Sequence, residues 1–306
     1  MTGAGAIARA AANRRGILYL TAAMVCLVLN DALMKHVGRE LGVPQMVFLR
    51  GVMALLMVVA VARATGALAR LPALRERPVL ARAGLDAVGT LLYLVSLMHL
   101  PLANATAINL AAPLIMALFA VLLLHEKAGV ARWLAIGIGF GGVLLVIQPR
   151  ADGFNAWALV CLAGTFCHVG RELLTRRIDR SLPAILVTLA SAVAVLVLAA
   201  AATVVDGWRP VRPLQLAQLA LAAALLSGGY FFIVNSMRHG EMTVVAPFRY
   251  VGLLVAVALG WLVWGEVPNA LAWGGILLLV GTGLYLMVEG RPRAAAVSDG
   301  PPVTRS

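Results

Sequence analysis

The sequence has few charged residues, and acidic residues are the scarcer kind. Of 306 residues, 12% are charged, with 13 Asp and Glu against 25 Lys and Arg, while 62% are hydrophobic. The mean hydropathy is +0.94. A soluble globular domain carries about 25% charged residues, roughly twice that share. The composition therefore excludes a soluble globular protein and predicts a chain embedded in a lipid bilayer.

The chain also lacks the residue patterns of disulfide frameworks, metal sites and catalytic centres. Its three cysteines, Cys26, Cys161 and Cys167, lie in apolar runs without metal-binding spacing. His-rich motifs, Asp-rich motifs and nucleophile–base sets are missing, so we expect no enzyme activity, no metal and no cofactor. The net charge of +12 comes without a basic face interleaved with aromatic residues, so we expect no nucleic-acid partner.

Long apolar runs make up most of the sequence. Each has about 19–23 residues, the length that crosses roughly 30 Å of hydrocarbon as a helix. They predict an all-α membrane protein with ten transmembrane helices, between a cytoplasmic tail at 1–15 and a disordered cytoplasmic tail at 291–306. The expected spans are 16–35, 43–62, 80–99, 103–125, 130–148, 155–175, 183–204, 214–236, 242–264 and 269–288.

The chain repeats itself weakly. Six residues recur 140 positions later without a gap: Gly89 as Gly229, Ser96 as Ser236, His99 as His239, Glu126 as Glu266, Trp133 as Trp273 and Gly141 as Gly281. With one residue inserted the first spans align too, and Asp31 and Lys35 match Glu172 and Arg176. We infer two units, 16–150 and 151–290, of five spans each. Because five is odd, we predict two inverted five-helix repeats, an arrangement that transporters use to expose one site to alternate sides.

Basic residues indicate the orientation of the chain in the membrane. With the N-terminus in the cytoplasm, 18 of the 25 Lys and Arg residues fall on the cytoplasmic side and 5 on the outer side. The remaining two, Arg50 and Arg249, lie inside spans. Since basic residues favour the cytoplasmic side, we expect both termini in the cytoplasm.

Polar residues inside the apolar runs are costly in lipid and need a partner, water or a function. Arg249 and its repeat equivalent Asn109 lie at similar depth from opposite faces, so we expect both to orient a solute in a central cavity. Alternatively, Arg249 pairs with Asp31, Glu172 or backbone carbonyls and only holds the bundle together. Five further residues are candidates for the solute site: Tyr93, Asn104, Thr106, Tyr230 and Tyr250.

Other ionisable residues receive different interpretations. Asp31 and Lys35 are four residues apart and can pair on one helix face, and Asp31 is also a candidate for proton coupling. We interpret Arg50 as structural, because the second unit has no matching charge. Glu126 and Glu266 precede the fifth and tenth helices, where a carboxylate is favourable with the helix dipole, so both are read as structural.

Two further expectations concern packing. Asp86 lies four residues after Arg82, which favours a local ion pair. Glycines give the fifth and tenth spans small faces for close packing, within the fold or between the subunits of a homodimer. These glycines are Gly137, Gly141, Gly275, Gly281 and Gly283.

Several motifs together resemble the EamA-type branch of the drug/metabolite transporter superfamily. They are Phe48-Leu49-Arg50-Gly51, the segment Pro101–Ala107, and the two sets Glu126, Trp133, Gly141 and Glu266, Trp273, Gly281. The resemblance covers residues 16–289. It implies two inverted EamA-like repeats, a central cavity lined by spans one, three, four, six, eight and nine, no use of ATP, and a place in a bacterial inner membrane.

The sequence thus favours a secondary transporter that moves a small polar organic metabolite through the bilayer by alternating access. Members of the branch that it resembles move amino acids, riboflavin, S-adenosylmethionine, opine-type metal chelators and drugs. The stretch from Asn104 to Asn109 is most similar to importers of riboflavin-like or nucleoside-like metabolites. The alternatives are an exporter of amino acids or of an opine-type metal chelator, and a membrane receptor or structural subunit that binds without flux.

Overall fold

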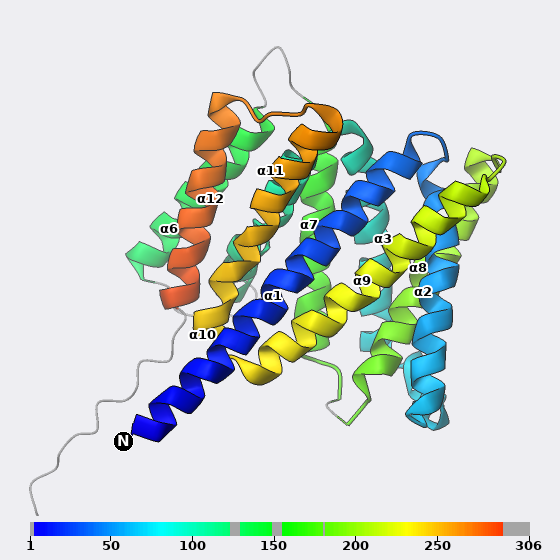
Figure 1. The fold of residues 1–306 in the computed structure, drawn as a ribbon, viewed down its shortest axis with the longest axis horizontal. Coiled ribbons are helices and arrows are strands. Elements are labelled where there is room, and N and C mark those ends of the chain that lie inside the picture. Colours follow the sequence, from blue (N-terminus) through cyan, green and yellow to red (C-terminus); the bar gives the residue numbers. More distant parts are fainter. Residues whose placement is uncertain (1–2, 123–128, 149–154, 180, 290–306) are drawn as a thin grey trace, which may run out of the picture.

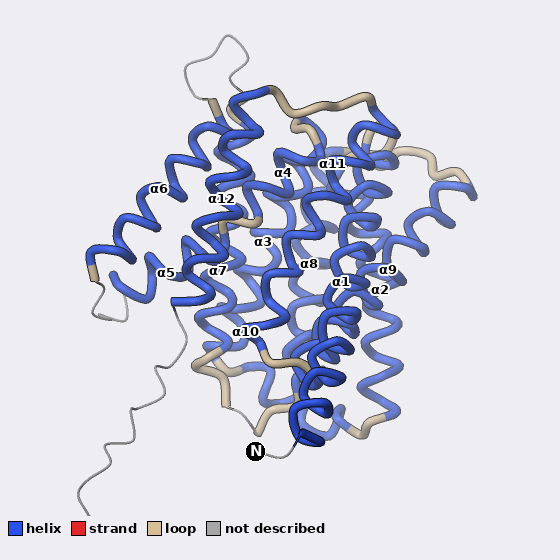
Figure 2. Tube along the Cα trace, turned by 60° about the vertical axis from the view of Figure 1, so that its left-hand side comes forward, coloured by secondary structure: helices blue, strands red, loops and turns tan. Residues whose placement is uncertain are grey.

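The computed structural model describes residues 3–122, 129–148, 155–179 and 181–289. Within these ranges the chain forms helices joined by loops, with no strand (Figure 2). Ten helices are long and apolar enough to cross a membrane. The structure therefore confirms the all-α membrane fold with ten spans.

The first five spans follow the expected apolar runs (Figure 1). A 3₁₀ segment, η1 (Ala67–Arg75), connects the second span to the third. The first span is longer than expected, because helix already begins in the Ala-rich tail, where alanine has the strongest helix propensity. The helices are α1 (Gly3–Gly38), α2 (Val43–Ala64), α3 (Arg77–His99), α4 (Leu102–Asn109) with α5 (Ala112–Leu122), and α6 (Val130–Ile147).

The second five spans repeat this order. The tail expected at 291–306 and the predicted structural residue Glu126 lie outside the described residues. The helices are α7 (Trp157–Thr175), α8 (Ala184–Asp206), α9 (Pro213–His239), α10 (Met242–Val245) with η2 (Ala246–Tyr250) and α11 (Val251–Trp264), and α12 (Ala270–Glu289).

The fourth and ninth spans are both interrupted. In the fourth, α4 ends at Asn109 and α5 begins at Ala112, just before Pro113. In the ninth, the 3₁₀ turn η2 contains Pro247 and separates α10 from α11. Proline lacks the N–H that an α-helix needs and its ring clashes with the preceding turn, which accounts for breaks next to both prolines.

The closest helix pairs join the two halves of the chain. Helix α1 packs on α9, α3 on α7, α2 on α8, and α6 on α12. Figure 1 shows α1 and α9 running side by side across the middle of the bundle, with α6 and α12 together at its left side. Buried apolar side chains from both halves form the main core, and large apolar side chains such as Val205, Leu262 and Leu277 point outward, as lipid-facing residues do.

Glycines bring α6 and α12 into backbone contact. A Cβ added at Gly142 would lie 2.8 Å from the carbonyl oxygen of Gly275, and one added at Gly275 would lie 2.5 Å from that of Gly142. A Cβ at Gly283 would collide with the Tyr250 hydroxyl. These glycines therefore serve packing within the chain. Space is open beside three others, Gly137, Gly141 and Gly281, and the homodimer stays a prediction.

Candidate functional site

Four polar side chains meet between α1, α2 and α3 and form what we call the α1–α3 cluster: Asn30, Asp31, Arg50 and Tyr93. The Tyr93 hydroxyl donates to Asp31 Oδ2 at 2.8 Å, and Asn30 Nδ2 donates to Asp31 Oδ1 at 2.9 Å. Arg50 Nη1 donates to Asn30 Oδ1 at 3.0 Å. Asn30, Arg50 and Tyr93 are buried, whereas Asp31 keeps part of its surface exposed.

The α1–α3 cluster lies at one depth in the bundle. Asp31 is seven residues from the end of α1, Arg50 seven from the start of α2, and Tyr93 six from the end of α3. At the helical rise this places all three about 10 Å inside the same end of the spans. Sequence reasoning separated these residues, because it treated Arg50 as structural, and only the fold shows that Arg50 neighbours Asp31.

A second group of charges lies nearer the other end of α3, and we call it the α3–α7 cluster: Arg82, Asp86, His168 and Arg171. Arg171 forms an ion pair with Asp86. Arg82 instead donates to Thr175 Oγ1 at 2.8 Å and to Ser191 Oγ at 2.6 Å. The local Arg82–Asp86 pair expected from their spacing is therefore wrong, because α7 packs on α3 and supplies a guanidinium that binds the carboxylate.

Tyr230 lies between the two clusters. It is a neighbour of Arg50 in the α1–α3 cluster and of Arg171 in the α3–α7 cluster. The Tyr230 side chain comes from α9 and is 48% exposed, although its neighbours are largely buried. The ring of Tyr93 also approaches that of His168, with centroids 6.4 Å apart. A partly exposed phenol therefore lies beside both charge clusters.

The predicted solute residues fall into two groups. Tyr93 belongs to the α1–α3 cluster, and buried Thr106 is close enough to interact with it. Asn109 ends α4 and Arg249 lies in η2, so both half-buried side chains stand at the breaks of the fourth and ninth spans. The oxygens Asn104 Oδ1 and Tyr250 Oη are buried without a hydrogen-bond partner in the described structure. A solute is one source of the missing partners.

The structure does not support the alternative in which Arg249 holds the bundle together. Within the described part of the chain, Arg249 forms no ion pair with Asp31 or Glu172 and no hydrogen bond to a backbone carbonyl. Asp31 has Arg50 as its charged neighbour. A half-buried guanidinium without a protein partner is available to bind a solute.

Lys35 has a partner that its spacing did not suggest. Its ammonium donates to Glu266 Oε1 at 2.6 Å, to Glu266 Oε2 at 2.9 Å and to the carbonyl of Leu100 at 2.7 Å. The expected pairing of Lys35 with Asp31 is therefore wrong. Glu266 Oε2 also accepts from the Leu102 N–H at 3.0 Å, so this carboxylate lies at the N-terminus of α4 rather than at that of the following α12.

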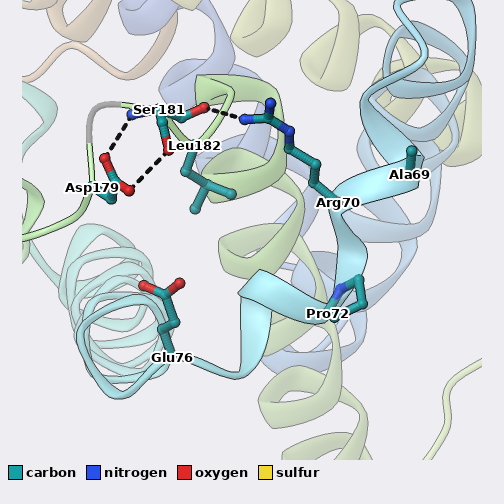
Figure 3. A pocket seen from close by; sticks show the side chains of 7 residues that line it. All are labelled: Ala69, Arg70, Pro72, Glu76, Asp179, Ser181 and Leu182. Carbon is teal, nitrogen blue, oxygen red and sulfur yellow. Dashed lines mark hydrogen bonds between the residues drawn. The ribbon is translucent and has the colours of Figure 1, made fainter.

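One surface pocket lies at the periphery of the bundle. It has a volume of about 260 Å³ and lies between η1 and the loop before α8 (Figure 3). Arg70 Nη1 donates to the Ser181 carbonyl at 2.8 Å, which holds the two segments together. Hydrogen bonds from the backbone and side chain of Ser181 lower the pKa of the Asp179 carboxyl. These exposed contacts shape a loop junction and are separate from both charge clusters.

Comparison with known proteins decides the family of this chain. The sequence model of the EamA-like transporter family matches the chain twice, at residues 14–148 and 155–288. The chain belongs to the EamA-like transporter family. This confirms the resemblance drawn from the sequence and makes the protein a multi-pass bacterial membrane transporter of small molecules rather than an enzyme.

Several EamA-like relatives are similar over most of their length. The pseudopaline exporter CntI of Pseudomonas aeruginosa is 29% identical over 87% of this chain and 94% of its own. A riboflavin transporter of Rhizobium johnstonii is 29% identical over 68% of this chain and 69% of its own. An S-adenosylmethionine uptake transporter of Rickettsia conorii is 24% identical over 61% of this chain and 63% of its own.

The EamA-like chain also resembles a solved structure. A chain described only as "Crystal structure of protein" superposes with a TM-score of 0.56 at 18% identity, over 92% of this chain and 98% of its own. At this identity the likeness concerns the fold alone.

Proposed function

We propose that this EamA-like protein is a secondary transporter that carries a small polar organic metabolite across the bacterial inner membrane by alternating access. Solute binds near the middle of the bilayer, where Asn109 and Arg249 orient it and Tyr93 and Tyr230 stack against it. Two inverted repeats rock around this position and open it to each side in turn. Asp31 is the proposed site of proton coupling.

One observation carries the proposal. The fourth and ninth spans are broken at positions that correspond in the repeat, at the end of α4 next to Asn109 and in η2 at Arg249. Interrupted helices leave backbone groups without helical partners, and such breaks inside a membrane are tolerated where they line a cavity. In transporters with inverted repeats, paired interrupted helices mark the solute site.

Equivalent contacts support the inverted arrangement. A Cβ added at Gly89 of α3 would lie 2.7 Å from the His168 ring of α7, and one added at the equivalent Gly229 would lie 2.9 Å from Leu27 of α1. Leu27 and His168 correspond at the spacing of 141 residues that aligns the first spans. Matched glycines thus contact matched partners, as expected if a two-fold axis relates the two units.

The solute class follows from the site and from the relatives. The polar stretch from Asn104 to Asn109 favours a riboflavin-like or nucleoside-like metabolite. Relatives named as riboflavin and S-adenosylmethionine transporters support a solute of this size and polarity. The excess of basic residues on one side supports inner-membrane insertion with both termini in the cytoplasm.

Export is the second candidate. The relative named as a pseudopaline exporter is similar over 94% of its length, more than the riboflavin transporter from Rhizobium johnstonii. This favours outward transport, with amino acids or an opine-type metal chelator as the alternative cargo. Comparing uptake into inside-out vesicles with uptake into right-side-out vesicles distinguishes export from import.

The test is solute exchange across sealed proteoliposomes that contain the purified protein. Vesicles are loaded in turn with riboflavin, S-adenosylmethionine and amino acids, and exchange of the labelled solute is measured. We expect exchange of at least one solute, and a loss of tenfold or more in Arg249→Ala with an unchanged unfolding temperature. Arg238→Ala, at the exposed end of α9, is the matched control and should keep full exchange.

Two results would contradict the proposal. Unchanged exchange in a folded Arg249→Ala protein would remove Arg249 from the solute site. Folded wild-type protein that binds a solute but exchanges none across a sealed membrane would favour the receptor or structural subunit instead.

A further inference from the structure

A buried arginine and a partly exposed aspartate of the α1–α3 cluster lie close together without a direct ion pair. Arg50 is 6% exposed and interacts electrostatically with Asp31. In the described structure no direct hydrogen bond or ion pair joins them. The amide of Asn30 stands between, accepting from Arg50 Nη1 at 3.0 Å and donating to Asp31 Oδ1 at 2.9 Å.

Keeping Arg50 and Asp31 apart destabilises the ligand-free protein. Opposite charges in a medium of low dielectric constant attract strongly, and buried pairs usually recover the cost of desolvation by direct, hydrogen-bonded contact. A neutral amide replaces only part of that contact. Of the five guanidinium N–H groups of Arg50, the described structure uses one, and each Asp31 oxygen accepts one hydrogen bond although it can accept two.

Arg50 is buried, and the exposed surface near the pair belongs to Asp31 and Tyr230. Asp31 keeps part of its surface exposed. Tyr230, which interacts with Arg50 from α9, has 48% of its surface exposed. Tyr93 fixes the carboxylate from the other side through its hydroxyl at 2.8 Å. A ligand that enters beside Tyr230 therefore meets a positive group and a negative group held at a fixed separation.

We propose that the α1–α3 cluster is a binding site for zwitterionic solutes, in which Arg50 binds the solute carboxylate and Asp31 binds its ammonium group. This inference rests on the proposed transport function, and it selects zwitterionic cargo, such as amino acids or S-adenosylmethionine, over the uncharged riboflavin-like class. It makes Arg50 a specificity-determining residue instead of a structural one. Solutes with one charge leave either the buried guanidinium or the buried carboxylate without a counter-charge, and the site rejects them for that reason.

Ligand-induced stabilisation of the purified full chain tests the proposal without a transport step. A ligand that binds only the folded state raises the unfolding temperature, and at equal concentration a tighter ligand raises it more. The probes are the twenty protein amino acids, S-adenosylmethionine and uncharged riboflavin, all at the same concentration. For the zwitterion with the largest effect, its methyl ester lacks the carboxylate and its N-acetyl form lacks the ammonium.

We expect stabilisation by at least one zwitterion, with an affinity at least tenfold higher than that of its ester and its N-acetyl form. Arg50→Gln should bind the zwitterion and its ester equally weakly, and Asp31→Asn should bind the zwitterion and its N-acetyl form equally weakly. Arg50→Lys keeps the charge and should retain part of the preference, which separates binding from misfolding. Arg209→Gln, at an exposed loop position, should match the wild type.

Several outcomes overturn the proposal. They are stabilisation by riboflavin with none by any zwitterion, equal binding of a zwitterion and its single-charge analogues, and an unchanged preference in folded Arg50→Gln. Each of these leaves the transport function standing, because riboflavin exchange in proteoliposomes is measured separately. Loss of all exchange with preserved zwitterion binding would instead remove the transport function and keep the site.

Discussion

Lys35 and Glu266 are 231 residues apart in the chain and form an ion pair of 2.6 Å in the structure. The Lys35 side chain is 2% exposed, and its three N–H groups are all used by Glu266 and the Leu100 carbonyl. Through the Leu102 N–H, Glu266 also holds the start of α4. One contact thereby ties α1, the turn between α3 and α4, and the loop between α11 and α12 at the same end of the bundle.

We expect Lys35→Met to destabilise the protein by about 3–5 kcal/mol, because it leaves a carboxylate in a buried site without its counter-charge. The free energy of unfolding in detergent, measured by denaturant titration, checks this. Arg209→Met is the control: Arg209 and Asp206 are 3.9 Å apart and 48% and 40% exposed, so its loss should cost under about 1 kcal/mol. Equal effects of the two substitutions would contradict the structural role of Lys35.

The double variant Lys35→Met with Glu266→Gln distinguishes two effects: the loss of the ion pair, and the presence of a carboxylate without its counter-charge. It should be more stable than Lys35→Met alone, because no uncompensated carboxylate remains. A double variant less stable than both single variants would show that Glu266 acts mainly through its hydrogen bond to α4.

Gly142→Ala should destabilise the protein by about 1–3 kcal/mol, since the added methyl would lie 2.8 Å from the Gly275 carbonyl oxygen and force α6 and α12 apart. Gly141→Ala makes the same chemical change one residue earlier, where nothing lies within 4 Å. It should be neutral or stabilising, because alanine favours helix over glycine. Thermal unfolding of both variants gives the comparison, and a larger loss in Gly141→Ala would refute the packing described.

Tyr93→Phe removes the hydrogen bond to Asp31 while keeping the ring. We expect a coupling free energy of roughly 1–2 kcal/mol between Tyr93 and Asp31 in a double-mutant cycle with Asp31→Asn, in the range of hydrogen bonds between membrane helices. Unfolding free energies of the four proteins supply it. Tyr285→Phe, at an exposed position of α12, should show no coupling to Asp31→Asn.

Tags fused to the two ends of the chain should both be accessible only from the cytoplasm. Ten spans return the chain to the side on which it began, and the basic residues set that side. Protease or thiol labelling of intact cells and inverted vesicles measures the accessibility of each tag. Tags on opposite sides of the membrane would exclude an even number of crossings and the inverted repeats with it.

Much of the fold could be predicted from the sequence, because in lipid the length of an apolar run sets the length of a helix. The second span was expected at 43–62 and is found at Val43–Ala64, and the sixth was expected at 155–175 and is found at Trp157–Thr175. The interruptions of the fourth and ninth spans lie at Pro113 and Pro247, which are visible in the sequence. The helix that extends back to Gly3 was missed, because the tail is too basic to appear as an apolar run.

Partners in the site could not be predicted in the same way. Spacing along one helix suggested Lys35 with Asp31 and Arg82 with Asp86. Lys35 instead pairs with Glu266 in the loop before α12, and Asp31, Arg82 and Asp86 each bind a side chain on another helix. Such contacts depend on which helices pack together and at which register, and polar patterning does not encode either. One chemical expectation did hold. The charged residues inside spans either have polar partners, as Arg50 does, or lie at a helix break, as Arg249 does.

Backbone contact between Gly142 and Gly275 has a mechanical consequence. Helices whose main chains touch cannot slide or separate without opening a void that no side chain can fill. Any motion that opens the interior first to one side of the membrane and then to the other must therefore leave α6 and α12 packed together. The displacement has to be taken up by other helices, among them α1, α2, α3 and α7, which carry the charged residues of the interior. Their movement would also move the groups that are proposed to hold the cargo.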